Sequence, residues 1–300
     1  MKERSQVASA LSGMAGSAGT LLFYPLEMLK VHMIVSDGHS KNAIPYYRNA
    51  YHALKSIYES QGFLQLYRGC HINIFSTFAW SLYFFFYEKA KTRYSAEFKE
   101  THNEAYRFLV AAEAAVVSRV ITNPLWVIKT RIMLQNSSQK WYGETFEAIR
   151  KTWKVEGLRG FAAGLTPGLV LCSSGAFQLY FYEHLKESIG SESSWKTGVA
   201  GGVSKLLSSS LLYPMQTVMV RLQQEQYSGT IAKRSVEVDL KTKGERIFSG
   251  FLNCIRSTYT HEGLRGFYRG LTVSLVRILP SNALFFMLYE KSYSVFSRYI

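Results

Sequence analysis

The chain has 300 residues, of which 47% are apolar and 15% aromatic, and it carries a formal net charge of +14. The charge favours an anionic partner. Nucleic acid is not expected, because there is no zinc-ligand spacing, no RNA-binding aromatic motif and no basic helix free of long apolar flanks. The three cysteines form no close pair and predict neither a disulfide framework nor a metal site.

Three landmarks recur in the same order and divide the chain into thirds. The first landmark is a proline, at Pro25, Pro124 and Pro214. In the segment after each proline, apolar and polar residues stand at the same intervals. A segment ending in glycine follows each proline, and a Tyr-Glu pair follows each glycine. Such self-similarity predicts tandem repeats within one transmembrane domain. The repeats are expected at residues 1–100, 101–192 and 193–300.

Each repeat contains two apolar stretches long enough to cross a bilayer, which takes roughly 20 helical residues. A proline near one end of each odd-numbered stretch predicts a bend, because proline lacks the N–H group and clashes with the preceding turn. Mixed polar and apolar spacing predicts short surface helices between paired spans, and residues 226–250 are expected to be mobile. The predicted fold is therefore an all-α membrane protein with six transmembrane helices in three pseudo-symmetric repeats. The spans comprise 4–34, 70–93, 104–134, 165–188, 195–225 and 271–296.

The repeated motif resembles that of the mitochondrial carrier family. In this motif an acidic and a basic position follow each proline, and an aromatic-basic-glycine triplet comes further on. The resemblance covers nearly the whole chain. It implies a monomeric six-helix barrel around a central cavity, which transports solutes by alternating access and has no catalytic residues and no cofactor. It also implies a multi-pass protein of the mitochondrial inner membrane, while the sequence leaves a peroxisomal membrane open.

Several segments are similar to carriers of large heterocyclic cargo. Residues 123–131, in which Trp126 replaces the usual acidic residue, look like carriers of bulky nucleotide-like substrates. Residues 35–38, 80–87 and 275–280 resemble the FAD and folate carriers in particular. The resemblance therefore implies FAD or folate as cargo rather than as a cofactor. Pyrimidine-nucleotide or NAD exchange is the alternative, since those carriers share the tryptophan motif.

The family resemblance also implies a gate at each end of the barrel. On the matrix side Glu27 is expected to pair with Lys129. Two other pairs of a complete gate are replaced by a Lys30–Gln216 hydrogen bond and by packing of a tryptophan on a methionine. A gate with one ion pair should open more easily than one with three. The expected matrix gate comprises Glu27, Lys30, Trp126, Lys129, Gln216 and Met219, and the opposite gate comprises Glu88, Lys91, Glu183, Lys186 and Glu290, whose partner base is in doubt.

Helical periodicity places cations on the cavity-facing side of two odd-numbered spans. Counting back from the gate positions at about 100° per residue brings Arg119 and Lys205 toward the cavity and turns Glu113 toward a neighbouring helix. An ionisable side chain within a span is expensive and usually functional. Cations without a matching carboxylate predict an anionic cargo.

The even-numbered spans supply the remaining candidate contacts. The family's substrate contact points, counted from the triplet glycine, fall at Ser76, Leu171 and Arg277, and Arg277 is the expected principal contact. Phe75 and Trp80 offer flat apolar surface on which a ring system can stack. The expected cargo is thus a small anionic heterocycle.

Two further expectations concern lipid and the alternative protein classes. In the family, cardiolipin phosphates bind at helix N-termini, where backbone N–H groups and the helix dipole attract anions. An enzyme is not favoured, because the seven histidines form no acid-histidine-nucleophile set, and a purely structural membrane protein would not need the cavity cations. The expected lipid positions are Arg68, Gly69, Gly143, Gly250, Arg269 and Gly270.

Overall fold

The computed structural model describes most of the chain. It covers residues 20–36, 45, 47–74, 76–93, 103–134, 145–189, 194–225, 246–278, 280–282, 284 and 287–288. Throughout these residues the regular structure is helical and no strand occurs, which confirms the all-α class.

The prolines interrupt two of the odd-numbered spans and leave the third one continuous. In the first span a 3-10 turn, η1 (Thr20–Phe23), leads into α2 (Tyr24–Val35), with proline in the first turn of α2. The fifth span is likewise split into α12 (Ser194–Leu211) and α13 (Tyr213–Glu225), whose second residue is proline. Proline is tolerated at these positions because the first N–H groups of a helix have no partner within it. The third span, α7 (Asn103–Met133), instead remains one helix with Pro124 inside it.

The even-numbered spans are helical as well, and the fourth is interrupted. The second consists of α4 (Cys70–Ile74) and α5 (Ser76–Arg93), the fourth of α10 (Leu165–Leu171) and α11 (Ser174–Ile189), and the sixth is helical at 271–278. The interruption after α10 was not predicted. There the backbone N–H of Ser173 reaches back only three residues, to the Val170 carbonyl at 3.1 Å, and the Ser173 hydroxyl donates to the same carbonyl at 2.7 Å. This competition tightens the turn and ends the α-helix.

The predicted surface helices are present between the paired spans. They are α3 (Ala50–Gln61), α8 (Thr145–Glu156) with the short α9 (Leu158–Phe161), and α15 (Arg246–Phe267), which kinks at Gly263; the 3-10 turn η2 (Phe63–Tyr67) follows α3. Residues 246–250, which we expected in a mobile loop, are therefore helical. The rest of that expected loop, 226–245, lies outside the described residues.

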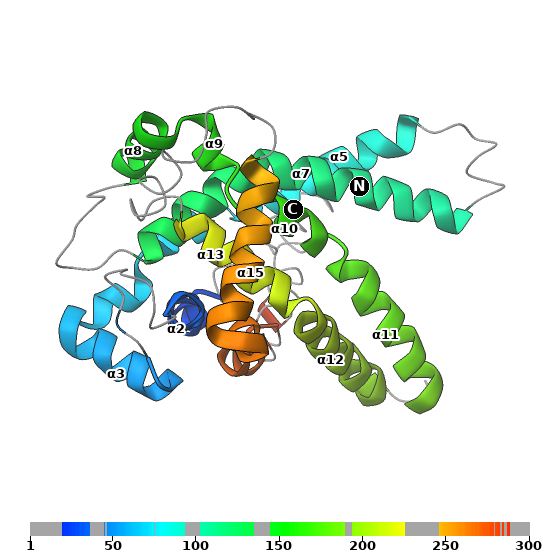
Figure 1. The fold of residues 1–300 in the computed structure, drawn as a ribbon. Helices are drawn as coiled ribbons and strands as arrows, with labels where there is room; N and C mark the ends of the chain where they lie inside the picture. Colours follow the sequence, from blue (N-terminus) through cyan, green and yellow to red (C-terminus); the bar gives the residue numbers. More distant parts are fainter. Residues whose placement is uncertain are drawn as a thin grey trace, which may run out of the picture.

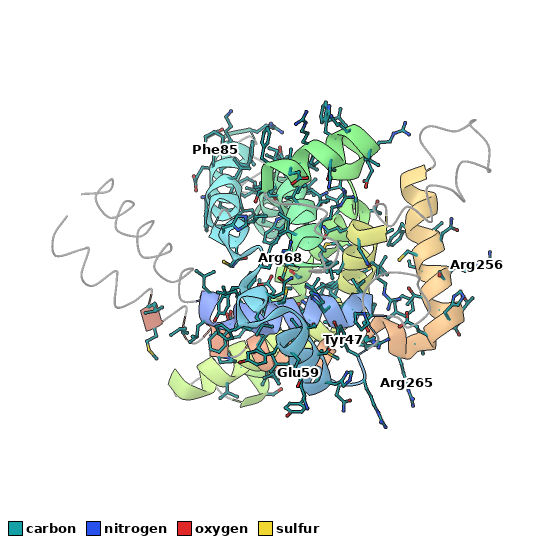
Figure 2. The ribbon with its side chains drawn as sticks, turned by 90° about the vertical axis from the view of Figure 1, so that its left-hand side faces the viewer. Tyr47, Glu59, Arg68, Phe85, Arg256 and Arg265 are labelled. Atoms are coloured by element: carbon teal, nitrogen blue, oxygen red, sulfur yellow. The ribbon has the colours of Figure 1, made fainter. Side chains whose placement is uncertain are left out.

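The helices pack in neighbouring pairs around a common centre. Figure 1 shows α5 running beside α7 and α11 beside α12, while α2, α7 and α13 converge near the middle of the molecule. Figure 2 shows Phe85 projecting from α5 at one edge and Arg256 from α15 at another. Within the described residues, one helical stretch, Leu158–Ser188, is long and apolar enough to pass as a membrane span on its own length and composition.

The convergence point of the odd-numbered spans is filled by apolar side chains. This central cluster joins the ends of α2, α7 and α13 that follow the three prolines. It therefore closes that end of the barrel by packing. Its buried members are Tyr24, Met28, Val31, Ile34, Val35, Met133, Leu134, Tyr213 and Val220.

Candidate functional site

One ion pair of the expected matrix gate lies beside the central cluster. The Nζ atom of Lys129 on α7 is 2.7 Å from Oε1 of Glu27 on α2. The Lys129 side chain is 3% exposed and that of Glu27 is 23% exposed, so water screens the pair only weakly. The structure thus brings together an acid and a base that lie 102 residues apart in sequence, as expected for this gate.

Lys129 has a further partner that the sequence did not reveal. Its ammonium group also donates to Oδ1 of Asn73 on α4 at 2.7 Å, and it lies 5.2 Å from the centroid of the Trp126 ring. The gate therefore links three spans, with an amide and an aromatic face sharing the charge of Lys129. The available signal was a polar residue one turn inside an otherwise apolar span.

The other expected matrix-gate contacts differ in the structure. No hydrogen bond joins Lys30 to Gln216 in the described part of the chain, and this expectation was wrong. The Lys30 ammonium instead lies 5.7 Å from the centroid of the Tyr213 ring, whose electron-rich face attracts a cation. The sulfur of Met219 faces Arg119, whose Nη2 atom is 2.8 Å away.

In the described part of the chain, the residues of the expected opposite gate form no ion pair between helices. Glu88 pairs at 2.7 Å with Lys91 within α5, and their side chains are 70% and 39% exposed. Glu183 and Lys186 on α11 are also exposed, and Glu290 lies outside the described residues. The Glu27–Lys129 pair is thus formed while Glu88 and Glu183 are exposed.

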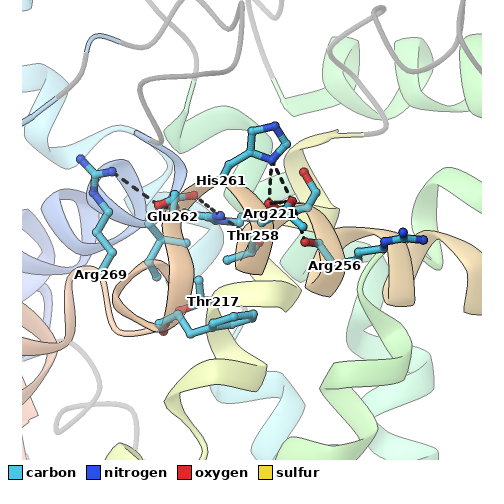
Figure 3. A network of polar contacts seen from close by, with 11 residues as sticks. Thr217, Arg221, Arg256, Thr258, His261, Glu262 and Arg269 are labelled. Carbon is cyan, nitrogen blue, oxygen red and sulfur yellow. Dashed lines mark hydrogen bonds and ion pairs between the residues drawn. The ribbon is translucent and has the colours of Figure 1, made fainter.

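A buried arginine ties the third repeat to its surface helix, as Figure 3 shows. Arg221 on α13 donates to Oγ1 of Thr258 and to Glu262 on α15, both at 3.0 Å, and to the backbone oxygen of Ile34 on α2 at 3.1 Å. Arg269 approaches the same Glu262 to 3.6 Å. This arginine clasp therefore joins the fifth span, the first span and a surface helix.

The second repeat contains an equivalent clasp, but the first does not. Arg131 on α7 donates to Oγ1 of Thr152 at 2.9 Å and to Glu156 on α8 at 2.7 Å. The corresponding first-repeat positions carry His32 and Ile57, both buried, and the His32 ring nitrogen Nδ1 lies 3.1 Å from the Met28 carbonyl oxygen. Sequence analysis missed the clasp because it followed only the first two polar positions after each proline.

The residue before each proline fastens its span to the backbone beside the triplet glycine. The Tyr24 hydroxyl donates to the Arg68 carbonyl at 2.8 Å, and that of Tyr213 donates to the Arg269 carbonyl at 3.0 Å. In the second repeat Asn123 takes this role, donating to the Ala163 carbonyl at 3.3 Å. Each contact fixes the start of an even-numbered span against the preceding odd-numbered one.

The expected lipid positions have mixed surroundings. Helices begin directly after Gly69 and Gly270, which adopt φ angles of +79° and +82°. The Arg269 guanidinium is occupied within the protein, since it also donates to the Tyr47 carbonyl at 3.1 Å. Because α15 begins at residue 246, Gly250 lies beyond the first four helical N–H groups, which are the free ones, and the expectation of a helix end there was wrong. Gly143 lies outside the described residues.

The three expected cavity cations differ in their partners. The Nη1 atom of Arg277 lies 3.8 Å from Oε2 of Glu27, so this carboxylate is shared between Lys129 and Arg277. Lys205 donates to the amide oxygen of Gln178 on α11 at 3.1 Å. Arg119 contacts the Met219 sulfur, and its Nε atom is buried without a hydrogen-bond partner. Among the described residues, neither Arg119 nor Lys205 has a carboxylate within ion-pair distance.

The structure describes the surroundings of only some of the remaining candidate residues. Glu113 forms an ion pair with Arg93 on α5, the neighbouring helix, as its helical position indicated. Leu171 is half-buried at the end of α10, whereas Ser76 and Trp80 lie on α5 with side chains outside the described structure. Phe75 also lies outside it. No group of three or more metal-ligating side chains occurs in the searched part of the chain.

Comparison with known proteins agrees with this architecture. The family model described as mitochondrial carrier protein matches three times, at residues 2–98, 100–193 and 190–299. The chain is 35% identical to the chloroplastic folate transporter 1 of Arabidopsis thaliana, with 92% of this chain and 91% of that protein covered. It is 30% identical to the mitochondrial nicotinamide adenine dinucleotide transporter 1 of Saccharomyces cerevisiae (94% and 75% covered) and 28% identical to the mitochondrial FAD carrier protein of the same yeast (96% and 95% covered). The chain therefore belongs to the mitochondrial carrier family.

Proposed function

We propose that this carrier moves FAD, a folate or both across the mitochondrial inner membrane by alternating access, without covalent chemistry. The observation that carries the proposal is the presence of Arg119 and Lys205 within the spans, with no carboxylate beside either among the described residues. A cation inside a membrane protein is costly unless an anion accompanies it for part of the cycle. Relatives named for folate and FAD transport support a large anionic heterocycle as that anion.

The contact between Arg277 and Glu27 supports a way for cargo to reach the gate. An anionic group that binds Arg277 competes with Glu27 for the same guanidinium, whose Nε atom is buried without a partner. Glu27 then holds only Lys129, which shares its charge with Asn73. Cargo binding therefore loosens the matrix gate. Substitution Arg277→Ala should abolish saturable uptake, and Arg277→Lys should recover part of it, since lysine keeps the charge but loses the planar fork.

NAD is the second candidate cargo, with pyrimidine nucleotides next. Two relatives about as similar as the FAD carrier are named as nicotinamide adenine dinucleotide transporters, at 30% and 27% identity. NAD and FAD share a pyrophosphate and an adenine, so the same cations suit either. The discrimination must come from the rest of the cavity wall.

The decisive experiment is uptake of labelled FAD, folates, NAD and pyrimidine nucleotides into proteoliposomes containing the purified protein. Saturable uptake of a flavin or folate, inhibited by its unlabelled form, is the expected result. Arg256→Gln serves as the matched control for the cavity variants, because Arg256 is an exposed arginine on a surface helix. Uptake of NAD or a pyrimidine nucleotide alone would favour the second candidate, and uptake of none of the panel would refute the cargo assignment.

A further inference from the structure

Arg119 differs from the other cavity cations in how it is held. Its guanidinium lies over Gly168 on α10, where an added Cβ atom would come within 2.8 Å of Nε and 2.9 Å of Nη2. Its one hydrogen bond in the described structure goes to the Met219 thioether, a weak acceptor. The side chain is thus positioned by a glycine and left without a strong partner.

A guanidinium in this setting is poised for an anion. A buried donor without an acceptor is costly, and the cost is larger when the donor is charged. Arg277 lies at ion-pair distance from Glu27, and Lys205 donates to Gln178. Arg119 instead contacts a thioether in the described structure, and its Nε atom, like that of Arg277, has no hydrogen-bond partner there. A phosphate or carboxylate would satisfy two donors of the guanidinium at once, which a thioether cannot do.

We propose that Arg119, seated on Gly168, is the first receptor for the anionic group of the cargo. The receptor lies where the third, fourth and fifth spans meet, since Arg119 belongs to α7, Gly168 to α10 and Met219 to α13. An anion binding there replaces the Met219 contact and leaves the matrix gate closed. Arg277, which is tied to Glu27, takes part later. The inference rests on the proposed function in one respect, that the cargo is an anion.

Glycine 168 allows the receptor to be tested without removing its charge. The atoms that a Cβ at this position would strike belong to the flexible end of Arg119, so Gly168→Ala should displace the guanidinium while the helices stay packed. Gly175 is the matched control, because a Cβ added there meets nothing within 4 Å. Loss of a charge-assisted contact predicts that Gly168→Ala raises the half-saturating cargo concentration about ten- to hundredfold, while Gly175→Ala leaves it unchanged.

Cys172 provides a readout that does not require transport. Its sulfur lies 3.5 Å from the Gly168 carbonyl oxygen and 3.8 Å from that of Ala115, one turn before Arg119. With Cys70 and Cys254 replaced by alanine, Cys172 is the only thiol of the chain. Its rate of alkylation by a small neutral maleimide then reports on occupancy beside Arg119. Inorganic pyrophosphate is the probe, followed by FAD, a folate and neutral riboflavin.

Pyrophosphate should slow the alkylation of Cys172 severalfold in the single-cysteine protein and in its Gly175→Ala variant. It should not slow alkylation in the Gly168→Ala or Arg119→Gln variants, and the Arg119→Lys variant should show an intermediate effect. Protection by FAD or by the folate shows whether a phosphate or a carboxylate occupies the receptor. If no compound is taken up but pyrophosphate protects, the proposed cargo is wrong and the receptor stands. Protection by neither pyrophosphate nor any transported compound overturns the receptor, whatever the uptake panel shows.

Discussion

Neutralising Glu27 should weaken the closed matrix gate far more than neutralising an acid at the opposite gate. Glu27→Gln leaves Lys129, whose side chain is 3% exposed, with a neutral amide and no carboxylate. Breaking a buried ion pair in this way costs about 3 kcal/mol, and in a chain of this size each kcal/mol lowers the midpoint by about 2 °C, so Tm should fall by about 6 °C. Glu88→Gln, which breaks a pair exposed to solvent within one helix, should lower Tm by about 1 °C or less.

The assay is thermal unfolding of the purified carrier in detergent, followed by a thiol-reactive fluorophore that reports exposure of buried Cys254. Exchanging the two charges, as Glu27→Lys with Lys129→Glu, should recover part of the lost stability and uptake. The recovery is incomplete because the new lysine faces Arg277, whose Nη1 atom lies 3.8 Å from the present carboxylate. Equal Tm values for Glu27→Gln and Glu88→Gln, or no gain from the exchange, would refute this account of the gate.

Three further predictions concern other parts of the barrel. Asn73→Asp places a second carboxylate on Lys129, so it should raise Tm in the same assay and slow cargo uptake; a lower Tm would contradict this. Gly164 and Gly157 have φ angles of +68° and +64°, but a Cβ at Gly164 would lie 2.9 Å from the Met219 carbonyl oxygen while one at Gly157 meets nothing. Gly164→Ala should therefore lower Tm by several degrees more than Gly157→Ala, and equal shifts would show that backbone strain alone matters. Cardiolipin should raise Tm more than a neutral lipid does, because anionic headgroups suit the helix starts after Gly69 and Gly270; equal shifts would remove the lipid proposal.

Repetition made the architecture predictable from the sequence. Three prolines at matching positions, each followed by landmarks in the same order, indicated six spans and the surface helices between them. The pairing of Glu27 with Lys129 was implied by the family resemblance, and the structure contains this ion pair. Landmarks of this kind depend only on spacing along the chain, so they can be recognised before the fold is known.

Contacts that depend on how segments meet could not be predicted. Asn73 belongs to the gate only because α4 starts beside Lys129. The guanidinium of Arg119 packs against Gly168, and a glycine within an apolar helix gives no sign in the sequence of which side chain packs on it. Residue spacing also gave no sign that Glu27 approaches two cations, Lys129 and Arg277. These contacts arise from the crossing of spans in three dimensions.

The apolar cluster behind the gate bears on how transport should vary with temperature and salt. Its members, among them Met28, Ile34 and Val220, must be wetted whenever the matrix end opens. Near room temperature the penalty for hydrating such surface is mostly entropic and carries a positive heat-capacity change. The free-energy barrier to opening should therefore change nonlinearly with temperature. Added salt screens ion pairs but does not loosen apolar packing. The stability of the closed state should therefore depend less on ionic strength than that of a gate built from three ion pairs.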